Sequence, residues 1–297
     1  MSAAEGTRLL KAAKSGDFQA FAKLLSWCER SPAGTVLGLK DLLKPARRTF
    51  RIGITGPPGA GKSTLVGSLI TDLLKRDLKI GVIAVDPSSP FTRGAILGDR
   101  IRYNEHFLNE NVFIRSLGTR GSLGGLSSAA FLMARAFDAC AFDILLIETV
   151  GVGQTELDVL HVADQVCVVL VPESGDAIQA MKAGLMEIAD IFVVNKSDRP
   201  GADGLAREIE ASVHDCEGSA RVVKCVATEG KGVAELTEML LTARSSDAIL
   251  DRRARPERLR EEAKALLRGE WERKLDVKLK KVKTAGDLAK LIGSRTR

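Results

Sequence analysis

The stretch FRIGITGPPGAGKSTLVGSLITDLLKR (50–76) decides the fold. It joins a short apolar run at 50–55 to a helical pattern through GPPGAGKST (56–64), which matches G-x-x-x-x-G-K-[ST]. Glycines in such a loop let successive backbone N–H groups turn inward around phosphate oxygens, and the amino terminus of the following helix adds a favourable dipole. We therefore predict a strand, a phosphate-binding loop and a helix over this stretch.

The loop supplies the first candidate binding residues. Lys62 can reach the β- and γ-phosphates of a nucleoside triphosphate, and the Ser63 hydroxyl can bind Mg²⁺. The predicted phosphate-binding set is Gly56, Pro57, Pro58, Gly59, Ala60, Gly61, Lys62, Ser63 and Thr64.

Outward from this stretch, short β-branched runs alternate with longer helical segments. The further runs are 79–86, 143–150, 165–172, 190–198 and 220–228. Near-continuous apolar strands separated by helices are typical of a parallel sheet covered on both faces. We predict an α/β fold of the P-loop NTPase type over residues 47–245, with a mostly parallel sheet.

The two ends of the chain have a helical character. Residues 1–46 read as helices that pack on the main domain, and one of them begins after an Asp17 cap. Residues 246–297 form a basic helical extension in which Leu267, Trp271, Leu275 and Leu279 recur every four residues. This spacing places an apolar stripe along one side of the helix.

The sequence Asn195-Lys196-Ser197-Asp198 identifies the base. It follows an apolar run, so it falls at the carboxyl edge of the sheet, where ligands bind. The Asp198 carboxylate can accept from the ring N–H and the exocyclic amine of guanine, whereas adenine presents the wrong edge. The Lys196 stem can lie along the base, and Asn195 can tie this loop to the phosphate loop. We expect GTP and GDP rather than adenine nucleotides.

The run at 143–150 ends in Glu148-Thr149-Val150-Gly151. Glu148 can hold the Mg²⁺ shell, and the N–H of Gly151 can meet the γ-phosphate. Many GTPases have a glutamine after this glycine to orient the attacking water, but here the residue is Val152. We therefore expect a GTPase that is slow without a partner, with help from Gln154, Asp99 or the partner.

Two further acidic residues are candidates for metal binding and catalysis. Asp86 closes the second predicted strand, beside the phosphate loop, and could accept a hydrogen bond from metal-bound or attacking water. Asp99 lies in ILGDR (96–100), a stretch suited to a loop that closes on the nucleotide. An Asp-Pro turn for Asp86 and a solvent-facing side chain for Asp99 are the structural alternatives.

Composition excludes several other classes of protein. The 297 residues are 45% hydrophobic and 28% charged, which argues against disorder and against a small disulfide-rich protein. No window approaches the roughly 20 apolar residues of a membrane span, and the amino terminus lacks a signal peptide pattern. The five cysteines form no C-x-x-C pair and the three histidines are isolated, so we expect a cytoplasmic protein without a thiol metal site.

The net charge of +6 is confined to one end of the chain. Residues 251–297 hold 16 basic and 8 acidic side chains, whereas residues 1–250 hold 28 and 30. Aromatic residues that could stack bases do not interleave with the basic ones, which argues against nucleic acid. We expect the extension to contact an acidic partner surface or a second copy of the chain.

Seven segments together resemble one known family. In chain order they are GPPGAGKST (56–64), VDPSSP (85–90), ILGDR (96–100), FIRSLGTRGSLGGLS (113–127), ETVGVGQTE (148–156), AIQAMKAGLMEIADI (177–191) and NKSD (195–198). This combination resembles the MeaB/ArgK family, the GTPase chaperones associated with methylmalonyl-CoA mutase. The resemblance is strong over about 48–200 and continues weakly to about 245.

The resemblance implies a GTPase of the signal-recognition and metallochaperone class. It implies that the protein controls cofactor loading and protection of an adenosylcobalamin-dependent acyl-CoA mutase, and that it forms a homodimer. Ala227 would offer backbone near the base, and the segment 173–182 would relay the nucleotide state to the mutase. The residues that the resemblance assigns to the Mg²⁺ and switch apparatus are Lys62, Ser63, Asp86, Asp99 and Glu148, and those of the relay are Glu173, Asp176, Gln179 and Lys182.

Both ends of the sequence depart from the family's usual pattern, which leaves the client and the dimer geometry open. Two alternatives share the nucleotide loops. One is a GTP-dependent metallochaperone for a nickel enzyme, although such proteins usually have His-rich or paired Cys sites. The other is a kinase for arginine or another small molecule, although no separate acceptor-binding constellation is visible in the sequence.

Overall fold

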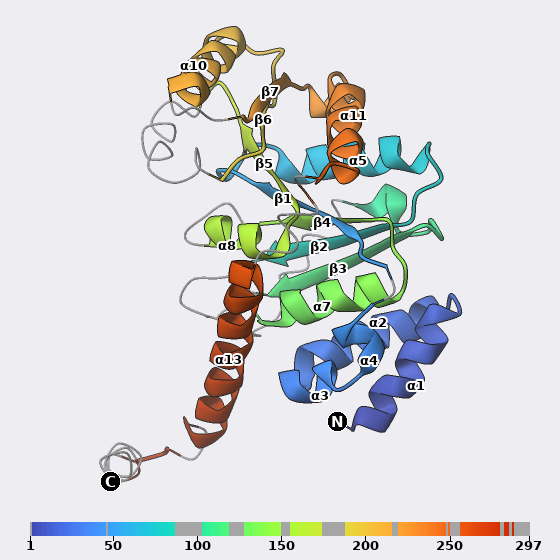
Figure 1. Ribbon diagram of the computed structural model, residues 1–297. Coiled ribbons are helices and arrows are strands. Elements are labelled where there is room, and N and C mark those ends of the chain that lie inside the picture. Colours follow the sequence, from blue (N-terminus) through green and yellow to red (C-terminus); the bar gives the residue numbers. More distant parts are fainter. Residues whose placement is uncertain are drawn as a thin grey trace.

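The computed structural model describes residues 2–45, 47–86, 103–118, 128–149, 155–173, 188–215, 219–247, 249, 256–279, 282–284 and 287. Seven strands form one sheet in the order β3-β2-β4-β1-β5-β6-β7, and each pair of neighbours is parallel (Figure 1). The strands are β1 (Phe50–Thr55), β2 (Ile80–Asp86), β3 (Val112–Gly118), β4 (Ile144–Glu148), β5 (Gln165–Leu170), β6 (Ile191–Val194) and β7 (Arg221–Lys224). The predicted α/β class with a parallel sheet is confirmed.

Helices cover both faces of this sheet. Two of them, α5 (Lys62–Leu74) and α11 (Val233–Arg244), pack in one buried cluster with the strands. Three others, α7 (Ser128–Ala139), α8 (Thr155–Val162) and α10 (Ala202–Asp215), pack in a second cluster on the opposite face. The described part of the domain also contains two 3-10 turns, η1 (Asn104–His106) and η2 (Ala227–Glu229).

One strand was missed by the sequence patterns. Each of the six predicted runs contains a strand, and β1 has the bounds that the apolar run 50–55 predicted. The seventh strand, β3, lies at the sheet edge, where its central residues are only half-buried. Because Arg115 and Ser116 interrupt its apolar residues, β3 lacks the continuous pattern of the inner strands.

The amino-terminal helices form an extra layer over α7. They are α1 (Ala3–Lys14), α2 (Phe18–Arg30), α3 (Ala33–Leu37) and α4 (Lys40–Leu43). The predicted cap is confirmed, since the Asp17 side chain accepts from the Ala20 N–H at 2.9 Å. Phe21 of α2 makes edge contacts with Phe113 and Phe137 and stacks on Phe142, so this layer shares the core of the main domain.

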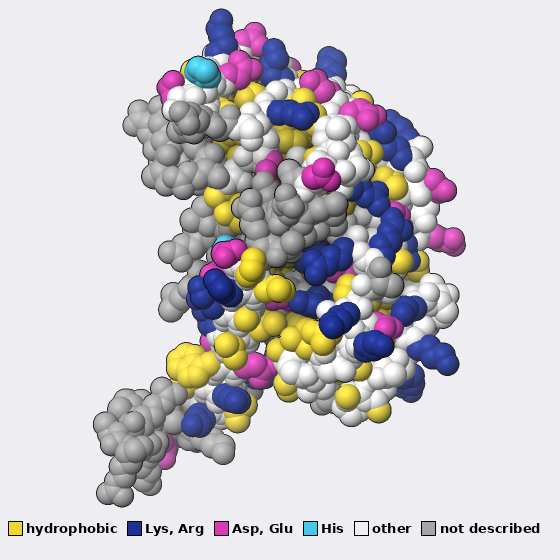
Figure 2. Space-filling model, viewed as in Figure 1, with side chains coloured by type: hydrophobic (Ala, Val, Ile, Leu, Met, Phe, Trp, Pro, Cys, Tyr) yellow, Lys and Arg dark blue, Asp and Glu magenta, His cyan; other side chains and the backbone are white. Residues whose placement is uncertain are grey.

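The long carboxyl-terminal helix α13 (Pro256–Leu279) docks on α7 and α8 by ionic contacts and projects away from the sheet (Figure 1). Arg135 of α7 binds the Glu262 carboxylate through Nε at 2.6 Å and Nη2 at 2.8 Å. Arg258 donates to Asp164 at 2.8 Å, and the same carboxylate accepts from the Arg51 N–H at 2.9 Å. The predicted apolar stripe faces elsewhere: Leu267, Trp271 and Leu279 are exposed and Leu275 is half-buried. Hydrophobic side chains are visible along α13 in Figure 2.

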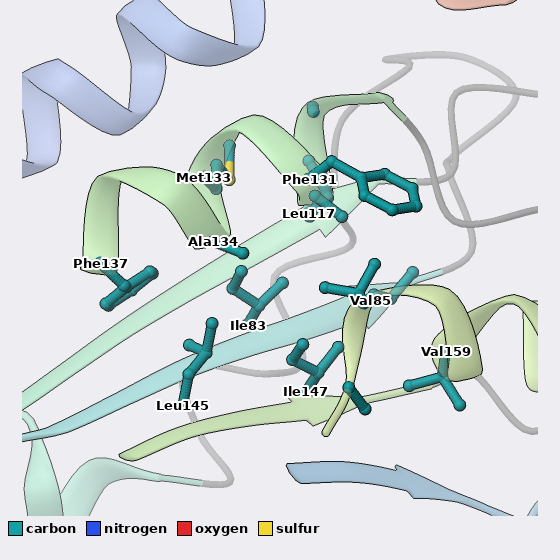
Figure 3. Close-up of a cluster of buried hydrophobic side chains, with 14 of the residues drawn as sticks. Ile83, Val85, Leu117, Phe131, Met133, Ala134, Phe137, Leu145, Ile147 and Val159 are labelled. Atoms are coloured by element: carbon teal, nitrogen blue, oxygen red, sulfur yellow. The ribbon is translucent and has the colours of Figure 1, made fainter. Parts of the chain in front are cut away.

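The core beneath α7 shows why the sheet needs near-continuous apolar strands. Ile83 and Val85 of β2 and Leu145 and Ile147 of β4 lie under Phe137 and its neighbours on α7 (Figure 3). These side chains are almost fully buried, and the alternate residues of the same strands pack against α5 on the other face. The paired faces hold the carboxyl ends of β1, β4, β5 and β6 at one edge, which is where the candidate site lies.

Candidate functional site

The phosphate loop adopts the backbone conformation that its glycines predict. Gly56, Gly59 and Gly61 have positive φ angles of 136°, 77° and 83°, which residues with side chains rarely adopt. A Cβ atom on Gly56 would lie 2.1 Å from the Val169 carbonyl oxygen, so this position has no room for one. Gly61 caps α5 without a side-chain hydrogen bond, and the dipole of the helix favours an anion at this end.

The Lys62 ammonium group lies at the centre of this loop. It donates to the carbonyl oxygens of Gly56 at 2.8 Å and Pro57 at 3.0 Å, and the side chain is buried. These bonds hold the cation inside the loop, from which it can reach the phosphates that the loop would surround.

Ser63 and Glu148 meet at the carboxyl edge of the sheet. The Ser63 hydroxyl donates to Glu148 Oε1 at 2.5 Å, and the Glu148 side chain is 5% exposed. Strands β2 and β3 lie between α5 and β4 in the sequence. The two elements meet because β4 is the sheet neighbour of β1, the strand that directly precedes α5. The predicted Ser63 and Glu148 are therefore brought together, as a hydroxyl and a carboxylate in direct contact.

Sequence reasoning missed Tyr103, which also binds Glu148. Its hydroxyl donates to Glu148 Oε2, and its side chain is 1% exposed. Tyr103 belongs to no nucleotide motif, so no local pattern could identify it. The single available signal is compositional, since it is the one tyrosine of the chain.

The predicted base-binding loop is tied to the phosphate loop by Asn195. Its Nδ2 donates to the Ala60 carbonyl oxygen at 2.9 Å, and its Oδ1 accepts from the Ala227 N–H at 3.1 Å. The Ala227 carbonyl oxygen in turn accepts from the Ser68 hydroxyl of α5 at 2.6 Å. One buried amide thus joins three loops, and the tie predicted between Asn195 and the phosphate loop is confirmed.

The other two residues of this motif face outward. Lys196 has a positive φ of 55° and its Nζ donates to the Gly59 carbonyl oxygen at 2.9 Å, so its stem crosses the edge of the phosphate loop. Asp198 is exposed. The next residue, Arg199, pairs with Glu173 at 2.5 Å.

Several predicted site residues lie outside the described part of the chain. The side chain of Asp86 is not described, although its backbone ends β2. The residues whose positions are not described at all are Asp99, Gly151, Gln154, Asp176, Gln179 and Lys182. Glu173 is the one member of the predicted relay that is described, and its partner is Arg199.

The structure describes four of the five cysteines. These four, Cys28, Cys140, Cys167 and Cys225, are buried. Burial raises the pKa of the Cys28 and Cys225 thiols to about 12. Within the described ranges, no group of three or more His, Cys, Asp or Glu side chains could hold a metal ion. No helix of that same part of the chain is long and apolar enough to cross a membrane.

Comparison with known proteins shows that the sequence matches one protein family over most of its length. The profile of the family described as "Methylmalonyl Co-A mutase-associated GTPase MeaB" matches residues 24–282. A protein of Pyrococcus horikoshii that bears a GTPase name is 44% identical over 282 residues, which cover 91% of this chain and 88% of that one. The GTPase ArgK of Escherichia coli is 39% identical over 68% of this chain and 64% of its own length.

The match to the family extends further than the motifs indicated. We expected the resemblance to fade at about residue 245, but the matched range includes most of α2 and all of α13. Amphipathic helices are defined by a pattern rather than by fixed residues, so a comparison of motifs does not register them.

Solved structures agree on the fold. A crystal structure described as an LAO/AO transport system kinase is 27% identical and superimposes with a TM-score of 0.65, over 95% of this chain and 88% of that one. The hydrogenase maturation factor HypB from Archaeoglobus fulgidus has a TM-score of 0.50 at 20% identity, over 80% of this chain and 98% of that one. The second likeness bears on the fold alone.

Proposed function

Because the chain belongs to the family of methylmalonyl Co-A mutase-associated GTPases named MeaB, and so is a GTPase that binds GTP and GDP, we propose that it acts as a chaperone of an adenosylcobalamin-dependent acyl-CoA mutase. In this role GTP hydrolysis controls the loading of the cobalamin cofactor and protects the mutase. The observation that carries the proposal is the family match over residues 24–282. A relative in Caenorhabditis elegans, 37% identical over 64% of this chain and 52% of its own length, is named a methylmalonic aciduria type A homologue.

The nucleotide would lie across the carboxyl edge of the sheet. Lys62 and the N–H groups at the start of α5 would hold its phosphates, with Gly151 at the γ-phosphate. Asn195 fixes the loop from which Asp198 would read guanine, and Lys196 crosses beside it. The base-reading and phosphate-binding residues are thereby held at a fixed separation.

The residues at this edge fit Mg²⁺. Ser63 and Glu148 place a hydroxyl and a carboxylate oxygen 2.5 Å apart, and oxygen ligands of this kind are those that Mg²⁺ prefers. We propose Asp86 and Asp99 as further members of the set. When bound, Mg²⁺ would neutralise part of the negative charge on the phosphates.

We propose that hydrolysis is slow in the isolated protein. Val152 stands where a water-orienting glutamine is common, so this work falls to Gln154, Asp99 or the mutase. A single-turnover rate near ten per second or more, about the rate of a fully assisted GTPase, would contradict this in the isolated protein.

The ion pair between Glu173 and Arg199 supports a relay from the base-binding loop to the mutase. Arg199 directly follows Asp198, and Glu173 opens the proposed relay segment that also includes Asp176, Gln179 and Lys182. The Arg199 side chain donates a hydrogen bond that lowers the pKa of Glu173. Both side chains are about half exposed, so the contact can rearrange at small cost.

We also propose a cytoplasmic homodimer. The exposed apolar side chains Leu267, Trp271 and Leu279 on α13 are suited to contact with a second copy. The two alternatives, delivery of nickel to an enzyme and phosphate transfer to a small molecule such as arginine, share the same nucleotide loops. A product assay for phosphorylated arginine would detect the second directly.

A pull-down from the cells of origin, with GTP and GDP in separate samples, tests the proposed client. Recovery of an adenosylcobalamin-dependent mutase in amounts that depend on the nucleotide supports the chaperone role. Recovery of nickel enzymes or ribosomes instead would contradict it. The Lys62→Ala variant is the matched control, because the loss of its phosphate contact should remove the dependence on added nucleotide.

A further inference from the structure

We propose that Tyr103 is a positioning residue of the nucleotide site, which holds the Glu148 carboxylate in the orientation that Mg²⁺ binding requires. This inference rests on the proposed role of Ser63 and Glu148 in holding the ion. No nucleotide motif contains Tyr103, and the inference comes from its contacts.

The two oxygens of the Glu148 carboxylate have different donors. Oε1 accepts from the Ser63 hydroxyl at 2.5 Å and Oε2 accepts from the Tyr103 hydroxyl. A carboxylate bonded through one oxygen can still turn about its last carbon–carbon bond, whereas a carboxylate bonded through both is fixed. Tyr103 therefore sets the plane in which the carboxylate meets Ser63.

Tyr103 is itself fixed by its surroundings. Its ring is 1% exposed and belongs to the buried cluster between α5 and the sheet, with Val82 and Val112. The next turn of the chain is bonded to α5, since His106 Nε2 lies 3.1 Å from the Gly67 carbonyl oxygen and the His106 N–H donates to the Tyr103 carbonyl oxygen at 3.0 Å. The phenol and Ser63 are thus both held by the helix that begins at the phosphate loop.

The identity of the acceptor distinguishes a positioning role from a purely structural one. A buried phenol requires a hydrogen-bond acceptor, and a backbone carbonyl would be sufficient for stability. Tyr103 instead donates to the buried carboxylate at the end of β4, and bonds to ionised groups are about twice as strong as neutral ones. Because the hydroxyl contacts the carboxylate proposed to hold the ion, its loss should change the Mg²⁺ requirement more than the affinity for nucleotide in the absence of Mg²⁺.

The Tyr103→Phe variant tests this, because it keeps the ring and removes the donor. The readout is release of a fluorescent N-methylanthraniloyl-GDP from the full chain, measured across a Mg²⁺ titration and in EDTA. We expect the Mg²⁺ concentration for half-maximal retention to rise about tenfold, as it does when partners of metal ligands are removed, with affinity in EDTA within about twofold of wild type.

Thr237→Val is the matched control. Thr237 is also a buried hydroxyl, which donates to the Val233 carbonyl oxygen at 2.9 Å, but it lies on α11 rather than beside Glu148. It should leave the Mg²⁺ half-point unchanged. Suppose that wild-type release depends on Mg²⁺ but Tyr103→Phe has the same half-maximal Mg²⁺ concentration as the control. This result would overturn the inference about Tyr103 and leave the proposed role of the ion intact. If release of the fluorescent GDP from the wild-type protein does not depend on Mg²⁺, both the proposed role of the ion and this inference are overturned.

A measurement that keeps the tyrosine ring does not depend on the folding of Tyr103→Phe. Labelling with ¹³Cζ-tyrosine gives one resonance because the chain has one tyrosine. Glu148→Gln replaces the charged acceptor with a neutral one, and we expect the resonance to shift. A resonance that does not respond to this substitution contradicts the contact between Tyr103 and Glu148.

Discussion

At the scale of single residues, the site is organised by buried side chains that bond to loop backbone. Asn195 is the clearest case, because one amide donates to Ala60 and accepts from Ala227. The buried amide has no water to replace these partners, so its position is strongly determined. The exposed Asp198, three residues further on, is then placed by a fixed loop.

The first prediction concerns base recognition by Asp198. Asp198→Asn replaces a carboxylate acceptor with an amide, which removes the complement to the two guanine donors and favours xanthine. We expect affinity for GTP to fall by about a hundredfold and affinity for xanthosine triphosphate to rise, as measured by competition binding. Asp203→Asn is the control, since Asp203 pairs with Lys224 at the surface and should leave the preference for GTP unchanged.

The second prediction concerns the buried thiols. Burial raises the pKa of Cys140 from 9.0 to about 11 and the pKa values of Cys28 and Cys225 to about 12. Between these folded values and the unfolded value of 9.0, the unfolded chain loses protons that the folded chain keeps. The free energy of unfolding should thus be unaffected below pH 9 and fall above it, by about 1 kcal/mol per pH unit for each thiol.

Urea unfolding under reducing conditions at pH 8 and pH 9.5 measures this fall. The Cys28→Ala variant should lose less stability between the two pH values than wild type does, whatever its stability at pH 8. Equal losses in the two proteins would show that Cys28 does not resist ionisation in the folded state.

At the scale of elements, the patterns that predicted the sheet worked where a strand is buried on both faces. The run 50–55 matches β1 because both neighbours of β1 in the sheet are strands and both faces are covered. β3 escaped prediction because its edge position tolerates Arg115, which pairs with Glu29 of α2 at 2.8 Å. This ion pair between β3 and an amino-terminal helix is a tertiary contact, which no local sequence pattern contains.

The same distinction applies to the site. Lys62, Ser63, Glu148 and Asn195 could be predicted because the chemistry of phosphate, Mg²⁺ and guanine fixes residue types at sequence positions after a strand. Tyr103 could not, because its role depends on a fold that brings a residue before β3 against the end of β4. Supporting residues of this kind are defined by contacts in space.

The third prediction concerns the docking of α13. Arg135 binds Glu262 through two nitrogens and also donates to the carbonyl oxygens of Leu42 and Leu43, so it joins α7, α13 and the end of α4. Both ionic side chains are largely buried. Arg135→Gln should lower the free energy of unfolding by about 3 kcal/mol, because it leaves the Glu262 carboxylate without its main partner.

Lys264→Gln provides the control for this substitution. It removes an exposed cation of the same helix that pairs with Glu261, and the expected change is about 0.5 kcal/mol or less. Chemical denaturation of both variants gives the comparison. If Arg135→Gln were as stable as the control, the ionic contacts would not hold α13 on the domain.

At the scale of the whole molecule, exposed apolar side chains gather on the carboxyl-terminal helix α13, whereas most of the basic excess lies in the sequence before and after that helix. The basic excess of the chain lies at 251–297, yet the part of α13 that touches the domain uses Arg258, Glu262 and Leu266. The sequence showed an apolar stripe, but its spacing could not show which side of the helix docks. The side chains of Leu267 and Trp271 are 71% and 52% exposed.

The fourth prediction is that this stripe supports the proposed dimer. A Leu267→Glu and Trp271→Glu double variant places charge on the exposed side of α13 and should convert the protein to a monomer in sedimentation velocity experiments. The control is Val277→Glu, which adds negative charge at an exposed apolar position of the same helix that does not belong to the stripe. A wild-type protein that sediments as a monomer at all concentrations would contradict the dimer.

The central claim is that the GTPase cycle of this protein serves an adenosylcobalamin-dependent acyl-CoA mutase. Single-turnover GTP hydrolysis by the purified protein, measured as purified methylmalonyl-CoA mutase is added, tests it most directly. We expect a slow basal rate that rises about tenfold or more and saturates with the mutase. A rate that does not change at any mutase concentration, with no complex formed in GTP or GDP, would contradict it.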